Sequence, residues 1–282
     1  MKEGQGSILR LEYTCQRVAG TCIYRSVNNV EFTGERVVPG GTTPANIFNE
    51  HEHRYNFAAQ FVPGQVVLDI ACGSGMGSQF LLEAGAKKVL GVDIDRQSLS
   101  VASNKYPKIE FTWGDASRHI PFSDASVDVV VSFETIEHLQ DQERFLNECR
   151  RVLKGGGRFI CSSPNRDVTE WLPPSRFHVK ELGAMEFIAL MHKHFPRAAT
   201  RPHGGVTFAQ RDLQYPKLVA RALARTATEA MGIKTILQRL LKIRPEPRAQ
   251  RDHFVVCPHG IRPYRRRQLH KPMFLIYVGD KT

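Results

Sequence analysis

The stretch Val66-Val-Leu-Asp-Ile-Ala-Cys-Gly-Ser-Gly-Met-Gly77 decides the fold of this 282-residue chain. Its first five residues are apolar or β-branched apart from one aspartate, a run typical of a central parallel strand. Gly73, Gly75 and Gly77 follow, and glycine permits the positive φ angles and close backbone approach of a tight turn. From Ser78 the apolar residues return at helical spacing. A strand, a glycine-rich turn and a helix in this order aim backbone N–H groups at a ligand above the strand's carboxyl end.

A second strand-like segment indicates which class of ligand this turn binds. Lys88 to Asp95 is apolar and contains Asp93, twenty positions after Gly73. An acidic residue at that distance stands at the tip of the adjacent strand, where its carboxylate can accept both hydroxyls of a ribose. The glycine pattern alone would also fit a tight turn that binds nothing. The added carboxylate favours a nucleotide-like cofactor.

Two further segments follow: Ile109 to Ala116 ends in a turn with a carboxylate, and Val127 to Phe133 leads into Glu134-Thr-Ile-Glu-His138. With these four motifs, the chain from about Thr33 to Ser163 resembles the Rossmann-like, S-adenosylmethionine-dependent methyltransferases. The loop form Asp-x-x-Cys-Gly-x-Gly at Asp69 to Gly75 fits this family, because nicotinamide enzymes use Gly-x-Gly-x-x-Gly. The resemblance implies a three-layer α/β fold whose seven-stranded sheet is mostly parallel with one antiparallel strand.

The resemblance also implies a set of residues that bind S-adenosylmethionine, carried over position by position: Arg54, Tyr55, Asp69, Ala71, Gly73, Gly75, Asp93, Ile94, Asp115, Ala116 and Phe133. Asp69 and the backbone from Ala71 to Gly75 would contact the methionine part, and Asp93 the ribose. Arg54 and Tyr55 precede the first strand, where such enzymes often hold the cofactor carboxylate.

The adenine would be read by three residues of this set. Ile94 would flank the ring. Asp115 would accept a hydrogen bond from the exocyclic amine while the Ala116 backbone N–H donates to a ring nitrogen.

Beyond the fourth strand, Glu134, Glu137 and His138 stand where an acceptor must meet the cofactor's methyl group. If they begin a helix, residues three and four apart share a face, so their side chains converge. His178 adds a second imidazole. The cluster is similar to that of metal-supported O-methyltransferases, among them ubiquinone-pathway and small-RNA 2′-hydroxyl methyltransferases, and this likeness implies Mg²⁺ or Mn²⁺ on these four residues. In the alternative, Glu137 and His138 are the catalytic residues without metal, with His138 as general base, and His178 has no special role.

Further elements follow along the chain. Residues 141–153 and 179–194 show helical spacing, with a strand over residues 158–163 between them. The last strands are predicted near Val255 and over residues 274–278. Residues 1–35 read as an N-terminal extension, and residues 36–282 as the methyltransferase domain with a basic helical insertion at about 216–252.

The formal net charge of +11 is concentrated in this insertion and in Arg265-Arg-Arg267. The insertion could be a cap that attracts an anionic substrate, or an amphipathic helical pair with a solvated charged face. It has almost no aromatic residues, which disfavours a single-stranded nucleic-acid platform.

Composition places the chain among ordinary globular proteins, with 41% hydrophobic residues. No apolar run approaches the roughly 18 residues of a membrane span, the N-terminus lacks a signal-peptide core, and the six cysteines form no Cys-x-x-Cys pair. We therefore expect a cytoplasmic enzyme that O-methylates a small molecule or a glycan, with no zinc or disulfide framework. An RNA 2′-O-methyltransferase, a carbon- or nitrogen-methylating enzyme and a catalytically silent binding protein are the alternatives.

Overall fold

The computed structural model describes residues 15–18, 21–24, 45–170, 175–196, 203–205, 262–263 and 273–282. Two short strands, β1 (Cys15–Val18) and β2 (Thr21–Tyr24), pair antiparallel within the predicted N-terminal extension. The basic insertion at about 216–252 and the strand predicted near Val255 lie outside the described residues.

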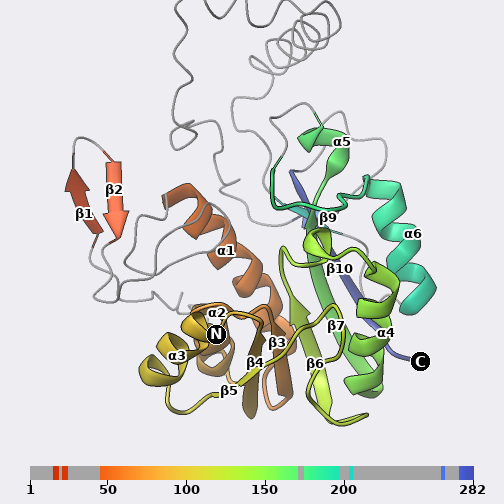
Figure 1. The fold of residues 1–282 in the computed structure, drawn as a ribbon, viewed down its shortest axis with the longest axis horizontal. Helices are drawn as coiled ribbons and strands as arrows, with labels where there is room; N and C mark the ends of the chain where they lie inside the picture. Colours follow the sequence, from red (N-terminus) through yellow and green to blue (C-terminus); the bar gives the residue numbers. More distant parts are fainter. Residues whose placement is uncertain are drawn as a thin grey trace, which may run out of the picture.

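One large sheet forms the centre of the molecule (Figure 1), and its strand order is β5-β4-β3-β6-β7-β10-β8-β9. The strands from β5 to β7 run parallel, β10 is antiparallel to both its neighbours, and β8 therefore runs in the same direction as β7. Their bounds are β3 (Val66–Ile70), β4 (Lys88–Asp93), β5 (Glu110–Trp113), β6 (Val127–Ser132), β7 (Leu153–Pro164), β8 (His203–Gly205), β9 (Arg262–Pro263) and β10 (Phe274–Asp280).

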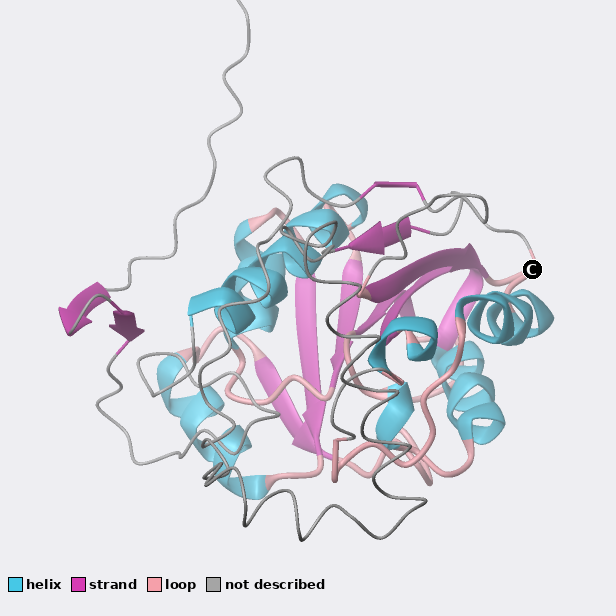
Figure 2. Ribbon diagram, turned by 90° about the horizontal axis from the view of Figure 1, so that it is seen from above, coloured by secondary structure: helices cyan, strands magenta, loops and turns pink. Residues whose placement is uncertain are grey.

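Helices cover both faces of the sheet, which gives three layers (Figures 1 and 2). Because side chains alternate along a strand, Val67 joins a core shared with α1 and α2, and Leu68 joins one shared with α4 and α6. Helix α3 packs against β4 and β5. The helices are α1 (Ala45–Ala58), α2 (Met76–Glu83), α3 (Arg96–Lys105), α4 (Gln142–Val152), α5 (Arg166–Thr169) and α6 (Ala184–His194), with one-turn 3₁₀ helices η1 (Ala59–Phe61) and η2 (Ile136–His138).

The predicted fold class is confirmed. The seven strands from β5 to β8 include one antiparallel member, β10, as the sequence predicted, and the two-residue β9 adds an eighth at the edge. The strand predicted from Arg158 begins earlier, at Leu153, and so takes in Lys154 to Gly157.

The helix expected from Val179 to His194 begins only at Ala184. The backbone N–H groups of Val179 and Lys180 instead donate to the carbonyl of Glu137, at 2.9 and 3.0 Å, which holds this stretch against η2. Hydrogen bonds to another segment thus replace the first helical turn. Among the described helices, none has both the length and the apolar content to cross a membrane.

Candidate cofactor and acceptor site

The parallel strands β3, β4, β6 and β7 end at one edge of the sheet, which we call the carboxyl edge. The glycine-rich turn leaves β3 there and becomes α2. Ala71, Gly73 and Gly75 have φ angles of 58°, 54° and 80°, in the left-handed region. A Cβ on Gly75 would lie 2.6 Å from the Phe111 ring and 2.9 Å from the Cβ of Ala102. Conformation and close packing therefore both require glycine at this position.

Asp93, at the end of β4, joins the turn to the adjacent strand. Its Oδ2 accepts from the Gly73 backbone N–H at 2.8 Å, and its Oδ1 accepts from that of Asp95 at 2.8 Å. A carboxylate has about four lone-pair positions, so each oxygen retains acceptor capacity for a ribose hydroxyl. Ile94, predicted to flank adenine, is 57% exposed beside it. Trp113, which the sequence did not single out, donates its Nε1–H to the carbonyl of Ile94 at 2.9 Å.

Asp69 is wholly buried beneath the turn. The Ser78 hydroxyl donates to its Oδ2 at 2.6 Å, and the Tyr55 hydroxyl to its Oδ1 at 3.0 Å. Burial raises the pKa of Asp69 to about 7, although both hydrogen bonds act in the opposite direction. Tyr55 also packs edge-on against Phe133, with ring centroids 5.1 Å apart. Asp69 thus connects three elements, α1, β3 and α2, and Ser78 is a partner that sequence reasoning missed.

Arg54, one residue before Tyr55 on α1, is a buried cation at the same edge. Its guanidinium carbon lies 4.6 Å from the centroid of the Phe274 ring, and its Nη1 is 4.0 Å from Oε1 of Glu134. Its buried Nε has no hydrogen-bond partner. A buried N–H donor without a partner is rare, and it suits the carboxylate of a cofactor. Burial raises the pKa of nearby Glu50 to about 7 against the attraction of Arg54.

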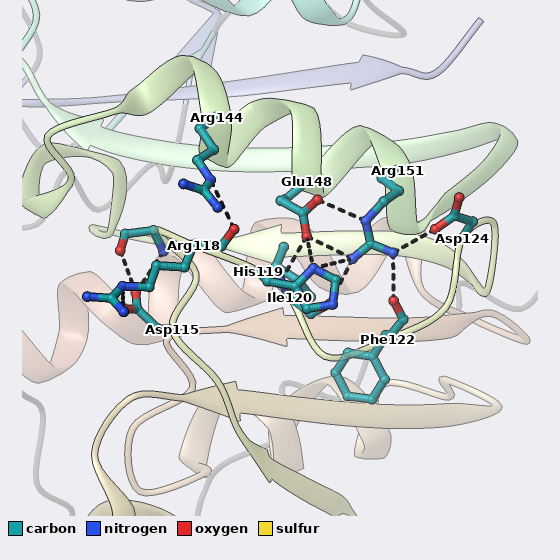
Figure 3. Close-up of polar contacts among 10 residues, drawn as sticks. Asp115, Arg118, His119, Ile120, Phe122, Asp124, Arg144, Glu148 and Arg151 are labelled. Atoms are coloured by element: carbon teal, nitrogen blue, oxygen red, sulfur yellow. Dashed lines mark hydrogen bonds and ion pairs between the residues drawn. The ribbon is translucent and has the colours of Figure 1, made fainter.

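Asp115 follows β5 and begins the loop between β5 and β6. Its Oδ1 accepts from the backbone N–H and the hydroxyl of Ser117, at 3.0 and 2.6 Å. Its Oδ2 lies 3.3 Å from Nε of the exposed Arg118 (Figure 3). The carboxylate therefore closes a local turn at the position predicted to meet adenine, with Ala116 inside that turn.

Three residues of the predicted metal set come together: one ligand atom each from Glu137, His138 and His178 lies within 4.8 Å of the others. The imidazole rings of His138 and His178 meet edge to face, with centroids 5.0 Å apart. Glu137 is wholly buried, and neither carboxylate oxygen has a hydrogen-bond partner. Burial, and next the charge of Glu134, raises the pKa of Glu137 well above its ordinary value. A buried carboxyl group without a hydrogen-bond partner is stabilised either by taking up a proton or by binding a cation.

Glu134 is the fourth predicted ligand, but its carboxylate contacts Ser162 and is not part of this group. Its φ of 51° is left-handed, and its Oε1 accepts from the Ser162 hydroxyl at 2.6 Å. Residues 134–138 do not begin a long helix, because only the single turn η2 forms and α4 starts at Gln142. The helical spacing that would have aligned Glu134 with Glu137 and His138 is therefore absent.

Glu181 is a further neighbour of this cluster that the sequence analysis missed. One carboxylate oxygen contacts Nδ1 of His178, and the other accepts from the Thr169 hydroxyl. On the other ring, Nδ1 of His138 lies 3.0 Å from the carbonyl oxygen of Phe177. The contacts at Nδ1 fix how both imidazoles are oriented.

The three-layer fold and the glycine turn at the carboxyl edge are those of a Rossmann-like α/β domain. Residues 68–161 match the family described as methyltransferase domain. A probable S-adenosylmethionine-dependent methyltransferase of Mycolicibacterium smegmatis is 39% identical over 162 residues, which are 56% of this chain and 62% of that protein. A ubiquinone biosynthesis O-methyltransferase of Idiomarina loihiensis is 36% identical over 113 residues, 39% of this chain and 46% of that protein.

Among solved structures, the YcgJ protein from Bacillus subtilis is 20% identical, with a TM-score of 0.53 over 82% of this chain and 99% of that one. This likeness concerns the fold. Residues 68–161 therefore match a methyltransferase domain, and a curated protein similar to this part of the chain is described as a probable S-adenosylmethionine-dependent methyltransferase, in agreement with the resemblance seen in the sequence. It spans less than two thirds of the length of the curated relatives it matches, 62% and 58% for two mycobacterial proteins.

Proposed function

We propose that the protein transfers the methyl group of S-adenosylmethionine to a hydroxyl oxygen of a small molecule or a glycan. The observation that carries this proposal is the grouping of Glu137, His138 and His178 at the carboxyl edge, with the buried Glu137 carboxyl lacking a hydrogen-bond partner. A hydroxyl is a weak nucleophile, so it benefits from a base or a cation. Carbon- or nitrogen-methylation would not need this cluster.

The cofactor when bound supplies an electrophilic methyl group on its sulfonium. The residues of this chain would bind and orient it. Asp93 would accept the ribose hydroxyls, the Ala71 to Gly75 backbone would lie along the methionine part, and Arg54 would donate its unpartnered Nε–H to the carboxylate. Because methyl transfer needs the acceptor in line with the sulfur–methyl bond, most of the rate gain would come from positioning.

Two mechanisms fit the acceptor side. In one, His138 takes the hydroxyl proton and Glu137, whose Oε1 lies 3.9 Å from His138 Nε2, stabilises the imidazolium that forms. In the other, Glu137, His138 and His178 would hold a divalent cation, whose charge would lower the pKa of a nearby acceptor hydroxyl. Two imidazoles and one carboxylate are softer ligands than the predicted set that included Glu134. They favour Mn²⁺ over Mg²⁺.

The cofactor assignment is tested by calorimetry with S-adenosylmethionine and S-adenosylhomocysteine. The parent protein should bind both. Asp93→Ala should weaken binding by about 1.5 to 3 kcal/mol, because it removes a charged acceptor. Thermal unfolding verifies that the variant is folded. Unchanged affinity in the folded variant would remove Asp93 from the cofactor site.

Chelation separates the two acceptor mechanisms. If a cation acts, EDTA should abolish turnover, Mn²⁺ or Mg²⁺ should restore it, and His178→Ala should weaken metal affinity about 10- to 100-fold. If His138 acts alone, activity should survive EDTA, His138→Ala should lower kcat by about 10² to 10⁴, and His178→Ala should change it little. His192→Ala removes an exposed imidazole of α6 that is not part of the cluster, and so provides a control for loss of an imidazole. Full activity in both His138→Ala and His178→Ala would contradict both mechanisms.

A further inference from the structure

The loop from Gly114 to Ser126, between β5 and β6, is held against α4 by Glu148 (Figure 3). Oε2 of Glu148 accepts from the backbone N–H of Ile120 at 2.9 Å and lies 2.8 Å from Nδ1 of His119. The same carboxylate accepts from Nε and Nη2 of Arg151, at 2.9 and 2.8 Å. The hydrogen bonds from Arg151 hold the pKa of Glu148 at about 2, so it stays ionised throughout the neutral range.

Arg151 completes the attachment from one turn further along α4. Its guanidinium donates to the carbonyl oxygens of Ile120 and Phe122, each at 2.8 Å, and to Oδ1 of Asp124 at 2.8 Å. The planar guanidinium offers five donors in a fixed arrangement, which a lysine could not reproduce. We call Glu148 and Arg151 the α4 clamp. Within the α4 clamp, Glu148 accepts from a backbone N–H of the loop, and Arg151 donates to two of its backbone carbonyls.

The clamped residues connect directly to Asp115. The backbone N–H groups of Arg118 and His119 both donate to the Asp115 carbonyl at 2.9 Å, and the N–H of Gly114 donates to the Asp93 carbonyl at 3.1 Å. Ile120 itself is wholly buried. The loop is thus fixed at one end by Asp93 and at the other by the α4 clamp, with Asp115 between them.

We infer that Glu148 and Arg151 are positioning residues for the adenine end of the cofactor site, acting through the loop that carries Asp115. This inference rests on the proposed function. Neither residue lies in the predicted site. A loop fixed only by its two strands would leave the Asp115 carboxylate free to shift, and a displacement of about 1 Å costs much of a hydrogen bond's strength.

A second carboxylate offers a matched control. Oδ2 of Asp128 accepts the backbone N–H of Val66 at 2.9 Å and its Oδ1 accepts from Lys154 at 2.8 Å. Like Glu148, it joins a backbone N–H to a cation and has a lowered pKa. Val66 and Asp128 lie at the amino-terminal ends of β3 and β6, away from the carboxyl edge of the sheet. Asp128→Asn therefore removes a similar structural contact without reaching the loop.

The experiment measures by calorimetry the affinity of the full chain for S-adenosylhomocysteine and for S-inosylhomocysteine, in which an oxygen replaces the exocyclic amine. The parent should prefer the amine-bearing ligand. Glu148→Gln and Arg151→Lys should weaken S-adenosylhomocysteine binding by about tenfold or more and reduce that preference. Asp128→Asn should keep both the affinity and the preference.

Equal weakening for both ligands, or unchanged binding in folded Glu148→Gln and Arg151→Lys, would overturn the inference while leaving the proposed function intact. If both variants fail to fold, the α4 clamp serves folding instead, and the inference is likewise overturned. A parent protein that binds neither ligand would refute the proposed function itself.

Discussion

At the residue scale, Asp69 is a buried acid whose structural role is to accept hydrogen bonds from two other elements. Its carboxyl group lies wholly inside the protein between the hydroxyls of Ser78 and Tyr55. Burial disfavours the charged form, which is why its pKa rises to about 7. The folded protein therefore binds a proton that the unfolded chain releases at a lower pH.

This difference makes folding stability depend on pH. Between the ordinary pKa of 3.8 and about 7, the folded state holds more protons than the unfolded state, so the contribution of Asp69 to stability is present below that range and lost as pH rises through it. Its slope is at most about 1.4 kcal/mol per pH unit. Asp69→Asn should flatten the decline in the free energy of unfolding, measured by urea titration at several pH values. An unchanged pH slope in the variant would contradict this assignment.

The sequence predicted correctly where in the fold the candidate residues of the glycine turn and of the end of β4 lie. Gly73, Gly75 and Asp93 occupy strand ends and turns, and strand periodicity places those correctly. Partners such as Ser78, Ser162 and Glu181 could not be predicted, because a side-chain hydrogen bond depends on packing between elements. Spacing within one segment does not contain that information.

At the scale of elements, the segment from Glu134 to His138 illustrates the limit of periodicity arguments. Its spacing is helical, yet the chain makes a left-handed step at Glu134 and a single turn at η2. Long-range contacts decide this outcome: Glu134 binds Ser162 on β7, and the Glu137 carbonyl accepts from Val179 and Lys180. Tertiary hydrogen bonds outweigh the small intrinsic preference for a longer helix.

The contact between α1 and α2 depends on Gly77. A Cβ at this position would lie 1.9 Å from Cζ of Tyr55, so Gly77→Ala should push the tyrosine away from Asp69. We expect a loss of about 1 to 3 kcal/mol in the free energy of unfolding. Gly155→Ala is the control, since a Cβ there meets nothing within 4 Å, and it should stay within about 0.5 kcal/mol of the parent. Similar denaturation midpoints for both variants would contradict the close packing at Gly77.

At the scale of the whole molecule, the excess of 39 Lys and Arg over 28 Asp and Glu gives the chain a net positive charge, which attracts anions. The densest part of this charge, between Lys217 and Arg251, lies outside the described residues. If it attracts substrate, Arg221→Glu with Arg225→Glu should raise KM and flatten its dependence on salt, with cofactor affinity unchanged.

The matched control for this double variant is Lys105→Glu with Lys108→Glu. It changes the net charge equally at two exposed positions near the end of α3. Kinetic assays over a salt series should separate the two double variants. The same salt dependence in both would mean that the basic segment is only a solvated surface.

The pairing of β8 with β9 at the sheet edge marks a place where the chain can gain or lose residues. His203 and Gly204 are in register with Pro263 and Arg262, so the chain leaves the sheet edge and returns to an adjacent position. Doubling the length of such an excursion adds only about 0.6 kcal/mol of closure entropy. The number of intervening residues can therefore change during evolution while the paired strands of the central sheet keep their positions.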